Sequence, residues 1–168
     1  MKHSKRFILI LVFVVLVLAL PTTALANKKL WTAKLSFANE LHQVVGSSAR
    51  GSAVFSSSVG GGSMSFGVQV QGLSGPVGGV HIHAPATTEQ NAPVILTLCG
   101  NPAPAAVASC TVTDGTLYIQ GTIDSSLLLQ WGITNRQFIE YLDNGMAYVN
   151  VHTALNPAGE ARGQIYPR

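Results

Sequence analysis

The sequence lacks the motifs of several common enzyme classes. It has no G-x-S-x-G nucleophile elbow, and none of its serines lies in a recognisable nucleophile motif. The glycine run of residues 60–62 is not a phosphate-binding loop, because the Lys-Ser/Thr ending and a following helix pattern are both missing. No internal repeat and no heptad pattern is present. The sequence therefore indicates neither a hydrolase nor a P-loop protein, and it assigns no catalytic residue.

The first 26 residues have the pattern of a cleaved secretory signal peptide. A basic head precedes the apolar run of residues 7–20, and an Ala-Leu-Ala sequence at residues 24–26 offers a cleavage site. The alternative is an uncleaved membrane anchor, but a spanning helix needs roughly 20 apolar residues. We therefore expect residues 27–168 to form a single exported domain, secreted or held in the cell envelope. Membrane association is expected only if the signal is not cleaved.

Removing this segment also removes the excess of positive charge. The whole chain has ten Lys and Arg residues against seven Asp and Glu residues, a formal net charge of +3. Lys2, Lys5 and Arg6 lie in the segment and every acid lies beyond it, so the exported domain has no net charge. Nucleic-acid binding needs a surplus of basic residues along one face. We therefore expect no nucleic-acid partner, and instead an unknown extracellular protein or surface partner.

The chain has only two cysteines, Cys99 and Cys110. Their spacing is not that of a metal knuckle, so a zinc site built on this pair is not indicated. An even pair in an exported protein predicts a disulfide, with two free thiols as the alternative. The bond would close a short loop and stabilise the fold by about 3 kcal/mol.

Alternating apolar and polar residues predict an all-β fold. In residues 64–71, Met, Phe and Val alternate with Ser, Gly and Gln, which is typical of a half-buried strand. Segments rich in Gly, Pro, Asn and Ser separate the strand patterns. Such spacing is typical of an antiparallel sandwich or barrel, and we expect a Greek-key β-sandwich of seven to eight strands. The other predicted strands are residues 30–37, 53–57, 77–83, 93–99, 116–123, 147–153 and 161–166.

One segment has the pattern of a helix. Thr134 and Gln137 are spaced as a capping box, and Phe138 and Leu142 would lie on one helix face. Gly145 is a suitable C-terminal stop. The pattern predicts one short helix near residues 135–144, closing one end of the sandwich.

Three histidines are candidate metal ligands. His81 and His83 are two residues apart on a predicted strand, so their side chains share a face, and His152 lies on a later strand with Asn150. If the two strands are neighbours, three imidazoles converge and could bind copper or zinc. The alternative is that these histidines only hydrogen-bond to backbone groups, to Asn150 or to an acid such as Glu160.

The C-terminal strand contains a second pair of polar residues. Glu160 and Arg162 share a strand face. They could form a cross-strand ion pair worth under about 1 kcal/mol if exposed. Alternatively, Arg162 could position an anion or Glu160 could orient a histidine ligand. We favour the structural role for this pair.

These motifs together resemble the chordin-type (CHRD) domain. The resemblance rests on Gly-Val-His-Ile-His at residues 79–83, Tyr-Val-Asn-Val-His-Thr at residues 148–153 and Gly-Glu-Ala-Arg-Gly-Gln-Ile at residues 159–165. It covers roughly residues 30–168, and residues 35–51 and 72–73 fit the opening strands. The resemblance implies a β-sandwich module of the kind found in chordin, which binds secreted growth factors, and in bacterial exported proteins.

A second resemblance concerns the histidines alone. Copper/zinc superoxide dismutases also use a His-x-His strand and a later strand histidine on a Greek-key sandwich with a disulfide. By this resemblance His81, His83 and His152 would be copper ligands, and Arg162 would correspond to the dismutase arginine. The sequence lacks a further histidine to bridge two metals and a His/Asp-rich zinc loop. We therefore expect a non-enzymatic binding or structural module, with a copper- or zinc-binding protein as the alternative.

Overall fold

The computed structural model describes residues 28–102, 104 and 106–168. The predicted signal peptide of residues 1–26 lies outside the described residues, so its cleavage stays a prediction. Within the described part, no helix has the length and apolar character needed to cross a membrane.

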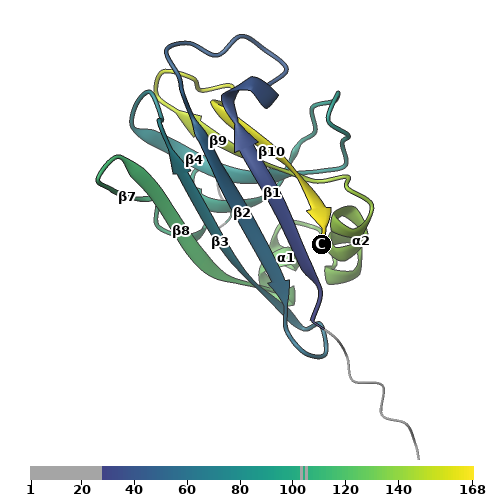
Figure 1. Cartoon of the computed structure of the whole chain (residues 1–168). Coiled ribbons are helices and arrows are strands. Elements are labelled where there is room, and N and C mark those ends of the chain that lie inside the picture. Colours follow the sequence, from purple (N-terminus) through teal and green to yellow (C-terminus); the bar gives the residue numbers. More distant parts are fainter. Residues whose placement is uncertain (1–27, 103, 105) are drawn as a thin grey trace, which may run out of the picture.

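In the described part of the chain, ten β-strands form one curled sheet with the order β6-β5-β4-β9-β10-β1-β2-β3-β8-β7. The sheet folds over itself into a β-sandwich, with β1, β2, β3 and β8 in one layer and β4 and β9 behind them (Figure 1). The strands are β1 (Leu30–Ser36), β2 (Arg50–Ser57), β3 (Ser63–Gln71), β4 (Val77–His83), β5 (Val94–Gly100), β6 (Ala106–Ala108), β7 (Thr111–Thr113), β8 (Thr116–Asp124), β9 (Tyr148–Thr153) and β10 (Ala161–Pro167).

The architecture differs from the expected one in two respects. The eight predicted strands correspond to β1–β5 and β8–β10, but the two edge strands β6 and β7 add to them. Each edge strand has only three residues, too few to produce a recognisable alternation. Strand β6 also pairs parallel to β5, so the sheet is mixed rather than purely antiparallel, and one sheet runs through both layers.

The hydrophobic core lies between the two layers. Alternate residues of β3, from Met64 to Val70, are buried, as are Trp31 of β1 and Val80 and Ile82 of β4. Because strand side chains alternate between faces, the polar neighbours of these residues point away from the core. The outer face of β4 and β9 is therefore available for His81, His83 and His152.

Two α-helices, α1 (Ser125–Gln130) and α2 (Asn135–Asp143), lie together at one end of the sandwich (Figure 1). The predicted helix is α2, and its capping box between Thr134 and Gln137 is present. Helix α1 was not predicted, because six residues are too few for a periodic pattern. A single 3-10 turn, η1 (Phe37–Asn39), follows β1.

The predicted disulfide between Cys99 and Cys110 is confirmed. Cys99 belongs to β5, and Cys110 lies between the edge strands β6 and β7. The bond therefore ties the segment between the two edge strands to β5. It also closes the loop that begins with Gly100 and Asn101, beside the histidines.

Candidate functional site

Buried polar side chains gather on the outer face of β4, β9 and β10. Residues opposite one another in an antiparallel pair share a face, and the strand register aligns two rows of polar residues across the three strands. The loops beyond these strands cover the rows, so the residues are buried or nearly so despite facing away from the core. The two rows are His81, Asn150 and Arg162, and His83, Tyr148 and Gln164.

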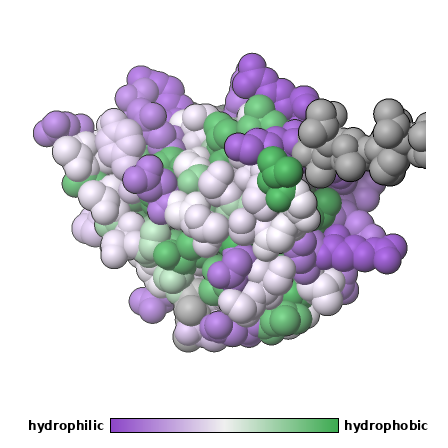
Figure 2. Space-filling view, turned by 90° about the horizontal axis from the view of Figure 1, so that it is seen from below, coloured by the Kyte–Doolittle hydropathy of each residue, from purple (hydrophilic) through white to green (hydrophobic). Residues whose placement is uncertain are grey.

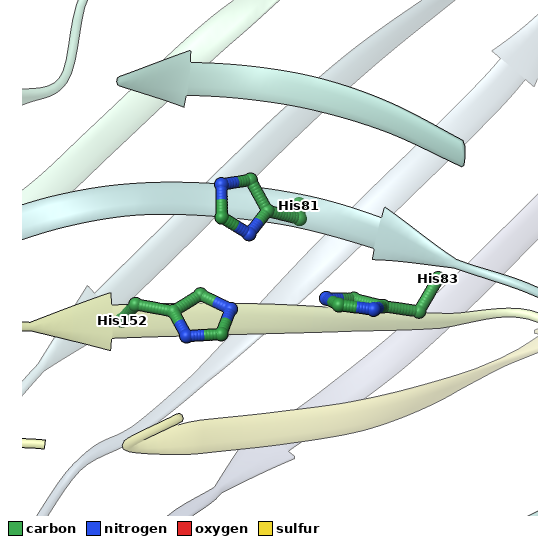
Figure 3. A group of neighbouring side chains, drawn as sticks. All are labelled: His81, His83 and His152. Carbon is green, nitrogen blue, oxygen red and sulfur yellow. The ribbon is translucent and has the colours of Figure 1, made fainter. Parts of the chain in front are cut away.

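The three predicted ligands lie together. One ligand nitrogen from each of His81, His83 and His152 can be chosen so that all three atoms are within 4.8 Å of one another. The ring centroids of His81 and His152 are 4.6 Å apart, and the His83 centroid is 5.8 Å and 5.9 Å from them. Figure 3 shows the three rings approaching one another from β4 and β9.

Each imidazole uses one ring nitrogen to contact a backbone carbonyl. A carbonyl oxygen only accepts hydrogen bonds, so the contacting nitrogen carries the hydrogen, and in a neutral ring the other nitrogen keeps its lone pair. The donors and acceptors are His81 Nε2 to Asn101 O, His83 Nδ1 to Ala92 O at 2.8 Å, and His152 Nδ1 to Pro157 O at 3.1 Å.

The second nitrogen of each ring has no hydrogen-bond partner among the described residues. His81 Nδ1, His83 Nε2 and His152 Nε2 are all buried and unpaired. Buried polar atoms in folded proteins are nearly always paired, so three such nitrogens in one place need an explanation. A metal ion bound by the lone pairs of these three nitrogens would explain why they are unpaired.

The environment keeps these histidines neutral. Burial lowers the pKa of His83 to about 4, and the nearby His152, His81 and Arg162 lower it further. Burial, followed by the charge on His81, lowers the pKa of His152 to about 4. Burial also lowers the pKa of His81, although its contact with Asn101 opposes the shift. Neutral imidazoles are the form that binds metal ions.

The histidines line a cavity of about 540 Å³. Its wall is mostly apolar and includes Val77, Val94 and Pro157. Two nitrogens bound to one copper or zinc ion, each at about 2.1 Å, are at most about 4.2 Å apart. The 4.8 Å separation therefore requires small ring rotations on binding, and the cavity leaves room for them.

The lowered pKa values predict that acid weakens the fold. Between about pH 6.5 and pH 4 the unfolded chain binds more protons at His83 and His152 than the folded one, so the free energy of unfolding falls as the pH drops through this window. Urea titrations across this range should show a shallower fall for His83→Gln than for the natural protein. An identical pH dependence in the two proteins would contradict the prediction.

The pH dependence of the natural protein has to be compared with that of His83→Gln because titration of Glu40 changes the free energy of unfolding in the opposite direction. Burial raises the pKa of Glu40 to about 7, although Arg162 opposes the shift. The contribution of Glu40 to the free energy of unfolding is therefore present at low pH and is lost as the pH rises from about 4.5 through 7. Only the difference between the natural protein and His83→Gln isolates the histidine effect.

Glu160 and Arg162 do not pair with each other. The Glu160 carboxylate accepts hydrogen bonds from the Ser74 N–H at 2.6 Å, the Ser74 hydroxyl at 2.7 Å and the Thr153 hydroxyl at 2.5 Å. Burial acts to raise the pKa of Glu160, but hydrogen bonds from Thr153, Ser47 and Ser74 outweigh it and lower the pKa. None of these contacts reaches a histidine, so Glu160 joins loops to β9. The cross-strand ion pair expected as the structural role of Glu160 and Arg162 is therefore not formed.

Sequence reasoning missed Glu40 and Tyr148. Glu40 follows η1 in a segment without periodic pattern, yet its side chain is only 2% exposed and it lines a second cavity of about 550 Å³ with Arg162 and Gln164. Tyr148 opens the Tyr-Val-Asn-Val-His-Thr motif of residues 148–153, but the sequence pattern indicates no separate role for it. In the structure its ring stacks on His83, and Asn150 makes no hydrogen bond to a histidine.

The fold and the site define an all-β sandwich module with a buried histidine cluster on one outer face. The family model of the CHRD domain matches residues 31–165, nearly all of the described chain. The chain belongs to the CHRD domain family, and the resemblance seen in the three sequence motifs is confirmed. No curated protein and no solved structure shows significant similarity to the chain.

Proposed function

We propose that this protein is an exported CHRD module that binds a partner or holds a structure together, rather than an enzyme. Membership of the CHRD family, the signal-peptide pattern of residues 1–26 and the Cys99–Cys110 disulfide support this proposal. The partner is an extracellular protein or surface.

Two apolar residues in adjacent loops support a binding surface. Val45 is 55% exposed and Leu155 is 52% exposed. The loops are joined because the Val45 N–H donates to Asn156 Oδ1, and a side chain at Gly46 would contact Leu155. At the end of the molecule shown in Figure 2, by contrast, apolar side chains are dispersed among polar ones.

Export is tested by intact mass and N-terminal sequencing of the protein recovered from its native host. We expect a chain that begins at Asn27 and carries an oxidised Cys99–Cys110 pair, found outside the cytoplasm. A full-length chain with free thiols in the cytoplasm would contradict the proposal.

We also propose a second function, which is binding of copper or zinc by His81, His83 and His152. The three unpaired ring nitrogens carry this proposal. Each is the lone-pair nitrogen of a ring whose other nitrogen is held by a backbone carbonyl, the arrangement that orients histidine ligands in metal sites. All three donors are neutral nitrogens, which suit copper and zinc better than the oxygen-seeking calcium or magnesium.

The residues around the ligands would have separate tasks. The carbonyls of Asn101, Ala92 and Pro157 fix which nitrogen of each ring is free. The apolar wall of the cavity would limit water around the bound ion. A bound metal would act as a Lewis acid or redox centre, open to a small ligand from the cavity side.

Calorimetric titration of the purified domain with Zn²⁺ and with Cu²⁺ tests this second function. We expect one ion per chain and release of protein-bound metal on adding a chelator. Absence of saturable binding for both ions would end the metal proposal and leave the binding module.

A further inference from the structure

Three side chains from neighbouring strands, His83 of β4, Tyr148 of β9 and Arg162 of β10, form a stack at one side of the histidine cluster. The rings of His83 and Tyr148 are parallel within 2°, with centroids 4.8 Å apart. The guanidinium carbon of Arg162 lies 3.6 Å from the centroid of the same tyrosine ring. Tyr148 therefore contacts both a proposed metal ligand and a buried cation.

Arg162 is fixed by the loop between β4 and β5. Its Nη1 donates to Asn91 Oδ1 at 3.0 Å, and its Nη2 donates to the carbonyls of Thr87 and Gln90 at 2.9 Å and 2.8 Å. Arg162 is only 2% exposed, and no carboxylate among the described residues lies within ion-pair distance of it. Burying the arginine charge is costly, and the hydrogen bonds to neutral acceptors, the contact with the tyrosine ring and the nearby charge of Glu40 offset this cost.

The same loop also holds His83. The Ala92 carbonyl accepts the hydrogen bond from His83 Nδ1, and the Ala92 N–H donates to the Tyr148 hydroxyl at 3.3 Å. His83 is thus held at its ring face by Tyr148 and at its Nδ1 by Ala92. The Ala92 contact belongs to the loop that Arg162 fixes, and the Tyr148 hydroxyl is hydrogen-bonded to the same loop.

We propose that Tyr148 and Arg162 are positioning residues for His83, which set its ring plane and hold it in the Nδ1–H form with Nε2 facing His81 and His152. This inference rests on the proposed metal site for its functional meaning, although the positioning itself exists without metal. Figure 3 shows the His83 ring lying alongside β9 and extending toward the other two rings. His81 and His152 have no such stack among the aromatic contacts of the described residues.

The first measurement uses the metal-free protein. Nitrogen-15 spectra of the histidine rings report which nitrogen carries the hydrogen. We expect a single Nδ1–H form for His83 in the natural protein, and a mixture of both forms in Tyr148→Leu and in Arg162→Met. The His81 and His152 forms should stay unchanged, which also shows that each variant is folded. Tyr148→Phe keeps the stack and should retain most of the Nδ1–H form.

The second measurement is the affinity for Cu²⁺, determined by calorimetry and by electron paramagnetic resonance of the bound copper. Loss of residues that orient a ligand weakens metal binding by roughly 10- to 100-fold, so we expect at least a tenfold loss in Tyr148→Leu and Arg162→Met. Arg162→Lys keeps a cation over the tyrosine ring and should recover part of the lost copper affinity. Tyr118→Leu and Arg136→Met, which change an exposed tyrosine and an exposed arginine elsewhere, serve as matched controls.

The two measurements separate the two proposals. If the natural protein binds neither Cu²⁺ nor Zn²⁺, only the metal proposal fails. The His83 spectrum then still decides whether Tyr148 and Arg162 position the ring. A single Nδ1–H form in both folded variants would overturn the positioning inference. A mixed form with unchanged copper affinity would support the positioning of the ring and overturn its proposed role in metal binding. If Tyr148→Leu does not fold, Arg162→Met and Arg162→Lys provide the comparison.

Discussion

Replacing His152 with alanine is expected to weaken binding of Cu²⁺ or Zn²⁺ by more than 100-fold. The substitution removes the only ligand that β9 contributes, and it leaves two nitrogens from one strand. Loss of an orienting group typically costs roughly 10- to 100-fold in metal affinity, so loss of a ligand should cost more. Calorimetric titration of the folded variant is the measurement.

The matched control for this prediction is His42→Ala. His42 lies outside the cluster, where its Nε2 contacts the carbonyl of Gly159. Both variants remove one imidazole from the chain, so non-specific binding to surface histidines would fall equally in the two. Unchanged affinity in His152→Ala, or an equal loss in His42→Ala, would contradict the three-histidine site.

Replacing Glu160 with alanine is expected to lower the free energy of unfolding by about 3 kcal/mol. The Glu160 carboxylate is fully buried and accepts hydrogen bonds from the Ser74 N–H, the Ser74 hydroxyl and the Thr153 hydroxyl. Without it the buried Thr153 donor and the partly buried Ser74 donors lose their acceptor, and each loss of a buried partner costs about 1–3 kcal/mol before relaxation. The measurement is the midpoint of urea unfolding at neutral pH.

Glu140→Ala provides the control for this prediction. Glu140 is more than half exposed and pairs with Arg136 four residues away on α2, an interaction worth under about 0.5 kcal/mol. Glu160→Gln keeps the shape of the side chain and should lose less stability than Glu160→Ala. Equal midpoints for Glu160→Ala and Glu140→Ala would show that the buried network contributes little.

The sequence predicted the parts of the fold that follow from periodicity. Alternation identified the eight longer strands, and the spacing of His81 and His83 placed both rings on one face. The adjacency of β4 and β9, which brings His152 to the same place, could be stated only as a condition. It depends on the order in which strands far apart in the sequence pair in the sheet, and no local pattern encodes that order.

The missed features come from loops. The carbonyls of Asn101, Ala92 and Pro157 select the free nitrogen of each ring, but a backbone carbonyl has no sequence signal. The path of a loop across a sheet face depends on many weak contacts. For the same reason the burial of Glu40 and the stack of Arg162 on Tyr148 could not be inferred from residue spacing.

The shortness of the two edge strands has a consequence for self-association of the protein. An unpaired sheet edge can recruit the backbone of a neighbouring molecule, and long edges are the usual route to fibrillar aggregates. Here β6 and β7 each offer only three residues, and the disulfide fastens the segment between them to β5. These two edge strands therefore present little template for self-association at high protein concentration.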